Sequence, residues 1–317
     1  MITRRRVLFA ALSLVPLAAA CGSKSDTSEA TKVIAVAKTT TTSSTVPLPL
    51  GKPSRIVSLS PSATETLFAI EAGPQVIAVD SFSNYPPEAP VTDLSAYEPN
   101  VEAIAKYQPD LVITDGTNTD LAAQLNKLGI PVLQAKAPKN LAGVYQQIET
   151  IGAATGNIAA AGKLSTKMQD QITALIKTYT KPTAGRVRYY YELDNTFYSA
   201  SSKTFVGALM AQFGMFNIAD KVDNSTTAGY PQLTPEFIVE ENPDVILLAD
   251  SKCCQQNEET VAARPGWSEI RAVKEGRVVV LDDDIAQRWG PRVLDLIQTI
   301  VQAITGVTPD PTIVYES

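Results

Sequence analysis

Two stretches of this chain share one residue pattern, and that pattern limits what the chain can fold into. Residues 99–114 read PNVEAIAKYQPDLVIT, and residues 233–248 read LTPEFIVEENPDVILL. The stretches align without a gap at an offset of 134 positions, and each ends in a continuous apolar run typical of a buried strand. A repeat of this length indicates a duplicated domain, since solenoid units are about 20–50 residues long. The matching positions are Glu102 and Glu236, Ile104 and Ile238, and Pro109-Asp110 and Pro243-Asp244.

A long amphipathic helix is predicted between the two repeats. In residues 157–179 apolar side chains recur every three or four positions, on one face of a helix, while lysines and other polar residues take the opposite face. Its length would be roughly 34 Å at 1.5 Å per residue. We expect it to end before Lys181-Pro182, because the residue before a proline avoids the α region. The helix therefore separates two halves of similar structure.

Each half alternates short apolar strands with helices, which is typical of a parallel sheet covered on both faces. We predict an α/β fold of two Rossmann-like lobes joined by the single long helix, with a ligand cleft between the lobes. Ser62 and Glu65 fit a capping box for the first helix. The predicted strands are 55–60, 76–79, 111–114 and 132–133 in the first half, and 186–191, 245–249 and 277–281 in the second. The other predicted helices are 63–71, 102–107, 121–128, 205–212 and one ending near 304.

In parallel sheets, ligands lie beyond the carboxyl ends of the strands. In the first half this criterion selects the loops 60–62, 80–85 and 115–118, together with Tyr97. A half-buried loop tyrosine is the structural alternative for each tyrosine in these segments. In the second half, Arg288 and Trp289 lie just past the last strand. Their alternative is a tryptophan that fills the core beside solvated arginines.

The N-terminus carries the features of an export signal. Three arginines precede the apolar stretch 7–20, whose last residues are three alanines, and Cys21 follows. Small residues before a cysteine suggest lipoprotein processing at Cys21; plain secretion after residue 20 is the alternative. The polar segment that follows cannot bury enough apolar surface to fold. The predicted domains are the signal 1–20, a lipid-anchored tether 21–53, the first lobe 54–156, the linking helix 157–181 and the second lobe 182–317.

Composition excludes several classes of site. The chain contains no histidine, which excludes Ser-His-Asp and Cys-His catalysis and histidine ligands to metals. Residues 156–163 resemble a phosphate-binding loop but have five residues between the glycines where four are needed. Loss of the three arginines in 1–20 changes the net charge from −6 to −9, which argues against a nucleic-acid partner. We predict no catalytic residues and no resident metal or cofactor, and hence no enzyme.

Two short motifs remain in the second half. The adjacent cysteines Cys253 and Cys254 form either a vicinal disulfide or two free thiols in an exported protein. Three consecutive aspartates, 282–284, could suggest a metal. Consecutive side chains point in different directions, so a solvated turn is the better interpretation.

From residue 54 to about residue 305, the chain resembles the substrate-binding proteins of cobalamin and ferric-siderophore ABC importers. The motifs that carry the resemblance are 55–65 (RIVSLSPSATE), 85–89 (YPPEA), the duplicated blocks described above, and 289–292 (WGPR). The resemblance implies that Glu102 and Glu236, one on each lobe, dock onto arginines of a membrane permease. It also implies that aromatic residues and an arginine line the ligand cleft. The positions that match are Tyr85, Tyr97, Tyr198, Tyr230 and Arg288, beside Trp289.

Tyr97 and Tyr230 are tryptophans in the family's cobalamin-binding members, which leaves a corrinoid and a ferric siderophore as alternative ligands. Tyrosine and arginine also suit anionic siderophores. Haem is less favoured, because the chain has no histidine to ligate its iron, although a tyrosine could do so. We therefore expect a monomeric, lipid-anchored, extracytoplasmic binding protein that delivers a bulky metal chelate to the permease dimer of an ABC importer. An envelope-anchored enzyme or structural protein that reuses the fold is the alternative.

Overall fold

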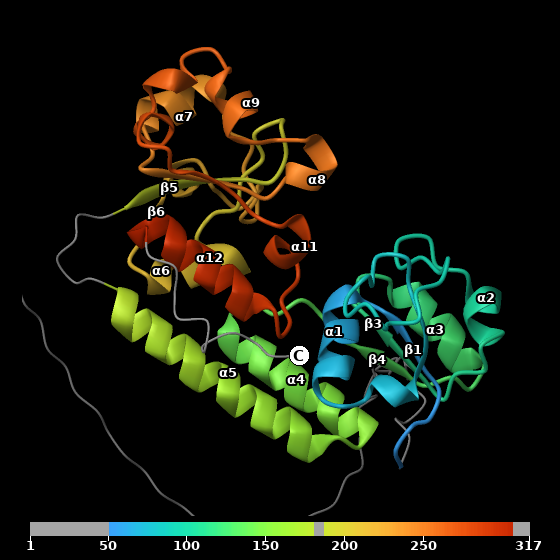
Figure 1. Ribbon diagram of the computed structural model, residues 1–317. Helices are drawn as coiled ribbons and strands as arrows, with labels where there is room; N and C mark the ends of the chain where they lie inside the picture. The colour runs from blue at the N-terminus through green and yellow to red at the C-terminus, as the bar shows by residue number, and fades with distance from the viewer. Residues whose placement is uncertain (1–50, 181–186, 307–317) are drawn as a thin grey trace, which may run out of the picture. The chain divides into compact units, whose positions relative to one another are not determined.

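The computed structural model describes residues 51–180 and 187–306 (Figure 1). The predicted export signal, Cys21 and the tether up to residue 50 lie outside the described residues, as do residues 181–186 and 307–317. No helix in the described ranges combines the length and the hydrophobicity needed to span a lipid bilayer.

The described chain forms two four-stranded parallel sheets, with the orders β2-β1-β3-β4 and β6-β5-β7-β8. The predicted α/β class with two lobes is confirmed. The first sheet consists of β1 (Ile56–Leu59), β2 (Val76–Val79), β3 (Leu111–Thr114) and β4 (Val132–Gln134). The second consists of β5 (Arg188–Glu192), β6 (Phe216–Asn217), β7 (Val245–Leu248) and β8 (Val278–Val280).

Helices connect the strands of each sheet. The first half contains α1 (Pro61–Ala69), α2 (Val101–Ala105) and α3 (Thr119–Lys127). The second half contains α6 (Phe205–Gln212), α7 (Pro235–Glu241), α8 (Ser251–Cys254), α9 (Glu258–Ala262), α10 (Arg271–Lys274), α11 (Asp283–Ala286) and α12 (Val293–Thr305).

The repeated Pro-Asp pair has the same structural task in both halves. The Asp110 carboxylate accepts hydrogen bonds from the backbone N–H groups of Ser54 (2.8 Å) and Arg55 (2.9 Å), just before β1. The Asp244 carboxylate accepts one from the backbone N–H of Arg188 (2.8 Å), the first residue of β5. Asp110 directly precedes β3 and holds the start of the neighbouring strand β1. Asp244 directly precedes β7 and holds the start of the neighbouring strand β5. The repeat in the sequence is therefore a repeat in the structure.

After β4 the chain forms two successive helices, α4 (Leu141–Thr155) and α5 (Ile158–Tyr179), which pack side by side (Figure 1). The long helix α5 was predicted to within one residue; α4 was not predicted. Gly156, with φ of 73°, ends α4 in the left-handed conformation that glycine adopts most easily. The buried face of α5 joins a hydrophobic cluster that also contains residues of β1, α1, β5 and α12. The two halves therefore share one apolar core.

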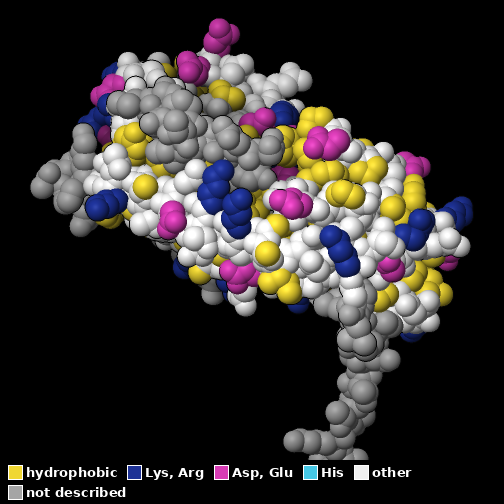
Figure 2. Space-filling view, turned by 60° about the horizontal axis from the view of Figure 1, so that its bottom comes forward, with side chains coloured by type: hydrophobic (Ala, Val, Ile, Leu, Met, Phe, Trp, Pro, Cys, Tyr) yellow, Lys and Arg dark blue, Asp and Glu magenta, His cyan; other side chains and the backbone are white. Residues whose placement is uncertain are grey.

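The opposite face of α5 is polar, as its sequence pattern predicts. On the face of the molecule drawn in Figure 2, basic and acidic side chains are interspersed among polar and apolar ones. Lys163, Lys167 and Asp170 of α5 are all exposed.

One prediction about the first helix was wrong. Ser60 caps α1, with its hydroxyl accepting from the backbone N–H of Ala63 (3.4 Å), and the helix begins at Pro61. Proline suits the first helical position, because that position needs no N–H donor. Glu65 therefore takes no part in capping this helix. Its side chain is buried and pairs with arginines of the second half.

Candidate functional site

The loops at the carboxyl ends of both sheets meet around a cavity of about 430 Å³. The first half contributes Ser60 and Ser62 after β1, Phe82 after β2 and Asp115 after β3. The second half contributes Lys252 after β7 and residues of the 283–289 segment after β8. This is the edge at which parallel sheets bind ligands. The volume lies in the range of about 300–1,000 Å³ typical of small-molecule sites.

Arg288 lines the cavity while its guanidinium connects the two halves. Its Nη1 donates to Glu65 Oε1 (3.2 Å) and Asn84 Oδ1 (2.7 Å). Its Nη2 donates to the Phe82 carbonyl (2.8 Å) and to Asp284 Oδ1 (2.8 Å). Only 7% of the residue is exposed. The predicted ligand residue is therefore already held by protein partners.

A second arginine reinforces the same contact. Arg292 Nη2 lies 2.5 Å from Glu65 Oε1, and its guanidinium stands 4.2 Å from the centroid of the Tyr85 ring. Burial works against the charge of Arg292, but the hydrogen bond and ion pair with Glu65 raise its pKa, so it stays charged. Burial also raises the pKa of nearby Asp295 to about 6. Tyr85 thus packs in the contact between the halves and is not among the residues that line the cavity.

Aromatic rings form part of the cavity wall. Tyr97 is 80% exposed and meets Phe82 edge-on, with ring centroids 5.5 Å apart. Trp289 stacks on Phe205, with centroids 4.4 Å apart. Phe82, Tyr97 and Trp289 all line the cavity. Sequence reasoning selected the loop that contains Phe82 but not the residue, whose signal is a bulky apolar side chain between two serines.

Besides Tyr85, two more predicted ligand residues do not line this cavity. Tyr198 and Tyr230 are 41% and 52% exposed. A backbone bridge between Tyr198 and Gln232 brings their segments together. Of the six predicted ligand residues, the cavity therefore brings together Tyr97, Arg288 and Trp289.

The three consecutive aspartates make different contacts, although Asp282 and Asp284 both pair with Lys252. Asp282 caps α11, and Asp284 bonds to Lys252 Nζ (2.8 Å) as well as to Arg288. Asp283 is buried and accepts from the backbone N–H groups of Ser251 (2.9 Å), Lys252 (2.9 Å) and Cys253 (3.2 Å). The interpretation as a solvated turn was therefore wrong for Asp283, which fastens α8 to α11. Across residues 51–180 and 187–306, no cluster of three or more potential metal-ligating side chains occurs.

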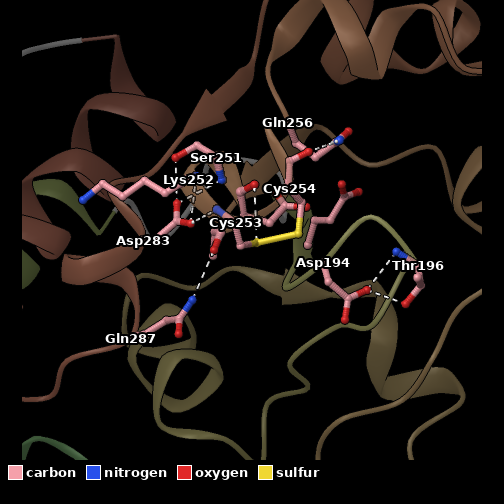
Figure 3. Close-up of a disulfide and its surroundings, with 12 residues drawn as sticks. Asp194, Thr196, Ser251, Lys252, Cys253, Cys254, Gln256, Asp283 and Gln287 are labelled. Carbon is pink, nitrogen blue, oxygen red and sulfur yellow. Dashed lines mark hydrogen bonds between the residues drawn. A yellow bond between two sulfur atoms is a disulfide. The ribbon is translucent and has the colours of Figure 1, made fainter. Parts of the chain in front are cut away.

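The adjacent cysteines are bonded to each other in the structure (Figure 3). Cys253 is exposed and lines the cavity, whereas Cys254 is half-buried. Both belong to the short helix α8, which follows β7 directly. The disulfide therefore stands at the carboxyl edge of the second sheet.

An acidic pair is buried directly behind α8. Asp250 is fully buried, and neither of its carboxyl oxygens accepts a hydrogen bond from the described residues. Burial first, and then the charge of the buried Glu192, raise the pKa of Asp250 to about 7. Glu192 is itself held by two bonds from Arg264, of 2.6 and 2.5 Å. Asp250 therefore keeps its proton at pH values where an ordinary aspartate has lost it.

The repeated glutamates occupy equivalent positions outside the cavity. Glu102 lies in the first turn of α2 after the cap Asn100, and Glu236 in the first turn of α7 after the cap Thr234. Both are exposed. Their carboxylates are favourable at a helix N-terminus in any case. Their position leaves them accessible to a partner.

Comparisons with known proteins agree with this architecture. A family model described as "Periplasmic binding protein" matches residues 56–285. The chain is 33% identical over 267 residues to the cobalamin-binding protein of Halobacterium salinarum, covering 81% of this chain and 71% of that protein. It is 31% identical over 261 residues to the uncharacterized ABC transporter substrate-binding lipoprotein YvrC of Bacillus subtilis, covering 80% of each. Among solved structures, the periplasmic heme-binding protein HutB of Vibrio cholerae has a TM-score of 0.69 at 25% identity, covering 79% of this chain and 98% of that one.

Proposed function

The chain belongs to the periplasmic binding protein family, and on that premise we propose that it captures a bulky metal chelate and delivers it to the permease of an ABC importer. The observation that carries the proposal is the cavity at the carboxyl edges of both sheets, where Tyr97 and Trp289 expose aromatic surface beside Arg288. Its relatives are named as binding proteins, and a binding site needs no catalytic residues.

Two chelate classes follow from the relatives. The relative in Halobacterium salinarum is named for cobalamin, and the solved structure from Vibrio cholerae for heme. A corrinoid is our first proposal, because the relative with the higher identity is named for one. Heme iron would need a ligand other than histidine from this chain, such as a tyrosine oxygen, since the sequence has no histidine. A ferric siderophore is the third candidate.

The aromatic residues have different proposed roles. Tyr97 and Trp289 would pack against the ring system of the chelate within the cavity. Tyr198 and Tyr230 would be reached by a ligand that extends beyond the cavity. Tyr85 would affect ligand binding only indirectly, because its ring packs against Arg292 in the contact between the halves.

Delivery requires a partner in the membrane. We propose that Glu102 and Glu236 contact basic residues on the two halves of the permease dimer. Exposed carboxylates at equivalent points of two similar lobes suit a partner with two-fold symmetry. The proposed lipidation of Cys21 and the tether up to residue 53 would hold the monomeric binding protein near that partner, on the outer side of the cytoplasmic membrane.

A fluorescence titration tests the ligand class. The chain has two tryptophans, Trp267, which is fully buried, and Trp289 at the cavity. We expect cyanocobalamin to quench the fluorescence saturably at submicromolar concentration, and we expect Trp289→Phe to remove most of the quenching. Saturable quenching by hemin or a ferric siderophore alone would reassign the chelate. No saturable response to any of the three classes would refute the proposed function.

A further inference from the structure

A disulfide between neighbouring residues stands in the wall of the cavity. Cys253 is exposed and lines the cavity beside Lys252 and Asp283. Figure 3 shows the two sulfur atoms between Asp283 and Gln287 on one side and Asp194 and Thr196 on the other. A ligand in the cavity and a thiol in solution therefore both have access to Cys253.

This disulfide contributes little to the stability of the whole fold. The stabilisation that a disulfide gives through the unfolded chain grows with the number of residues in the loop it closes. Cys253 and Cys254 are adjacent, so they close the smallest loop a chain can form. The bond instead fixes two side chains of α8 in one eight-membered ring. Its effect is therefore local to the cavity wall.

The segment that carries the disulfide is tied to a residue of the cavity. Asp283 accepts from three backbone N–H groups of α8. Lys252 Nζ lies 2.8 Å from Asp284, which lies 2.8 Å from Arg288. Arg288 in turn reaches Glu65 in the first half. These contacts link α8 to a guanidinium that lines the same cavity.

We propose that the Cys253–Cys254 disulfide is part of the ligand-contacting surface, and that its reduction weakens ligand binding. This inference rests on the proposed capture of a metal chelate in the cavity. The closed ring presents polarizable sulfur in one fixed place, which suits contact with the conjugated ring system of a chelate. The open dithiol presents two polar S–H groups with free side-chain torsions, and ordering them against a ligand costs entropy.

The redox step is ordinary thiol–disulfide exchange. A thiolate of an external dithiol attacks one cysteine sulfur and forms a mixed disulfide, while the other cysteine leaves as a thiolate. The second thiol of the reagent then displaces the first cysteine. Two electrons and two protons pass from the reagent to the protein, which ends with two thiols, and the reagent ends as a cyclic disulfide.

The test compares three forms of the full chain with cyanocobalamin, hemin and a ferric siderophore as probes. The forms are the oxidised wild type, the wild type reduced with dithiothreitol and freed of the reagent without air, and the double variant Cys253→Ser/Cys254→Ser. We expect the reduced form and the variant to bind the active probe about five-fold more weakly than the oxidised form. We also expect a saturating probe to slow reduction of the bond, measured as thiols released over time, because binding and oxidation favour each other.

The double variant supplies the internal control, because Cys21 is the only other cysteine in the sequence. Dithiothreitol must leave the affinity of that variant unchanged. Equal affinity in all three forms, with a tight-binding oxidised wild type, would overturn this inference and leave the proposed function intact. An oxidised wild type that binds none of the probes would overturn both. If the variant does not fold, protection of the wild-type bond by the probe decides the question, and absence of protection refutes the inference.

Discussion

Replacing Asp250 with asparagine should make the protein more stable at neutral pH. Asp250 is fully buried beside Glu192, and its pKa is about 7 against 3.8 for an unperturbed aspartate. The folded protein therefore keeps this proton at pH values where the unfolded chain has lost it. Raising the pH through this window favours the unfolded chain, so the free energy of unfolding falls. The other charges that face Asp250 are those of Arg264 and Asp283.

The size of the effect follows from the same two pKa values. At about 1.4 kcal/mol per pH unit, the wild type loses up to roughly 4 kcal/mol between about pH 4 and about pH 7 through this group. Asparagine has no proton to lose, and its amide can donate to Glu192. Asp250→Asn should therefore match the wild type near pH 4 and exceed it progressively up to about pH 7. Above that pH the difference should stay constant.

Urea denaturation from pH 4 to pH 8 measures this difference, with the buried Trp267 as a fluorescent reporter. Asp295, whose burial raises its pKa to about 6, titrates in both proteins and cancels in the comparison. Asp93→Asn, which removes an exposed acid of the first half, is the control and should show no comparable pH trend. A difference between Asp250→Asn and the wild type that does not change with pH would refute the proposed protonation of Asp250.

Three further outcomes are expected. Gly152→Ala should destabilise the protein by about 1–2 kcal/mol in urea denaturation, because the new Cβ would stand 2.3 Å from that of Ala161. Gly162→Ala is the control: its new Cβ meets nothing within 4 Å, so it should stabilise the protein by up to about 1 kcal/mol. Equal effects of the two substitutions would contradict this reasoning. Glu65→Gln should cost about 3 kcal/mol in the same assay, because Arg288 and Arg292 would lose their shared buried carboxylate, whereas the exposed control Glu98→Gln should change little. Glu102→Ala combined with Glu236→Ala should abolish chelate uptake by cells while leaving ligand affinity unchanged; loss of both together would argue against a docking role.

The repeated Pro-Asp blocks made the two-lobed fold predictable, because each block leads directly into an apolar run that forms a buried strand. The helix α4 escaped prediction for an equally physical reason. Its sequence holds Gly143 and Gly152, and glycine lowers helix propensity by about 1 kcal/mol per residue. Gly152 is needed there because α5 passes too close for any side chain. Tertiary packing has overridden the local preference.

The site was predictable only where the sheet edge alone determines position. Tyr97, Arg288 and Trp289 line the cavity. Sequence position beyond the strands was enough to select them, since carboxyl ends of parallel strands share one edge. The partners of Arg288 in the first half were not predictable. Asn84 and the Phe82 carbonyl lie more than 200 positions away, and no local pattern connects them.

The contact between the halves and the cavity share Arg288, so we expect ligand binding and the arrangement of the lobes to be coupled. A ligand that contacts this guanidinium must either leave its hydrogen bonds to Glu65, Asn84 and Asp284 in place or replace some of them. The α4–α5 pair and the hydrophobic cluster common to both halves oppose any large opening, because separation would expose buried apolar surface. Binding should therefore adjust the lobes by small movements centred on the 284–292 segment. A large rotation between ligand-free and ligand-bound structures would show that the shared core does not restrain the lobes.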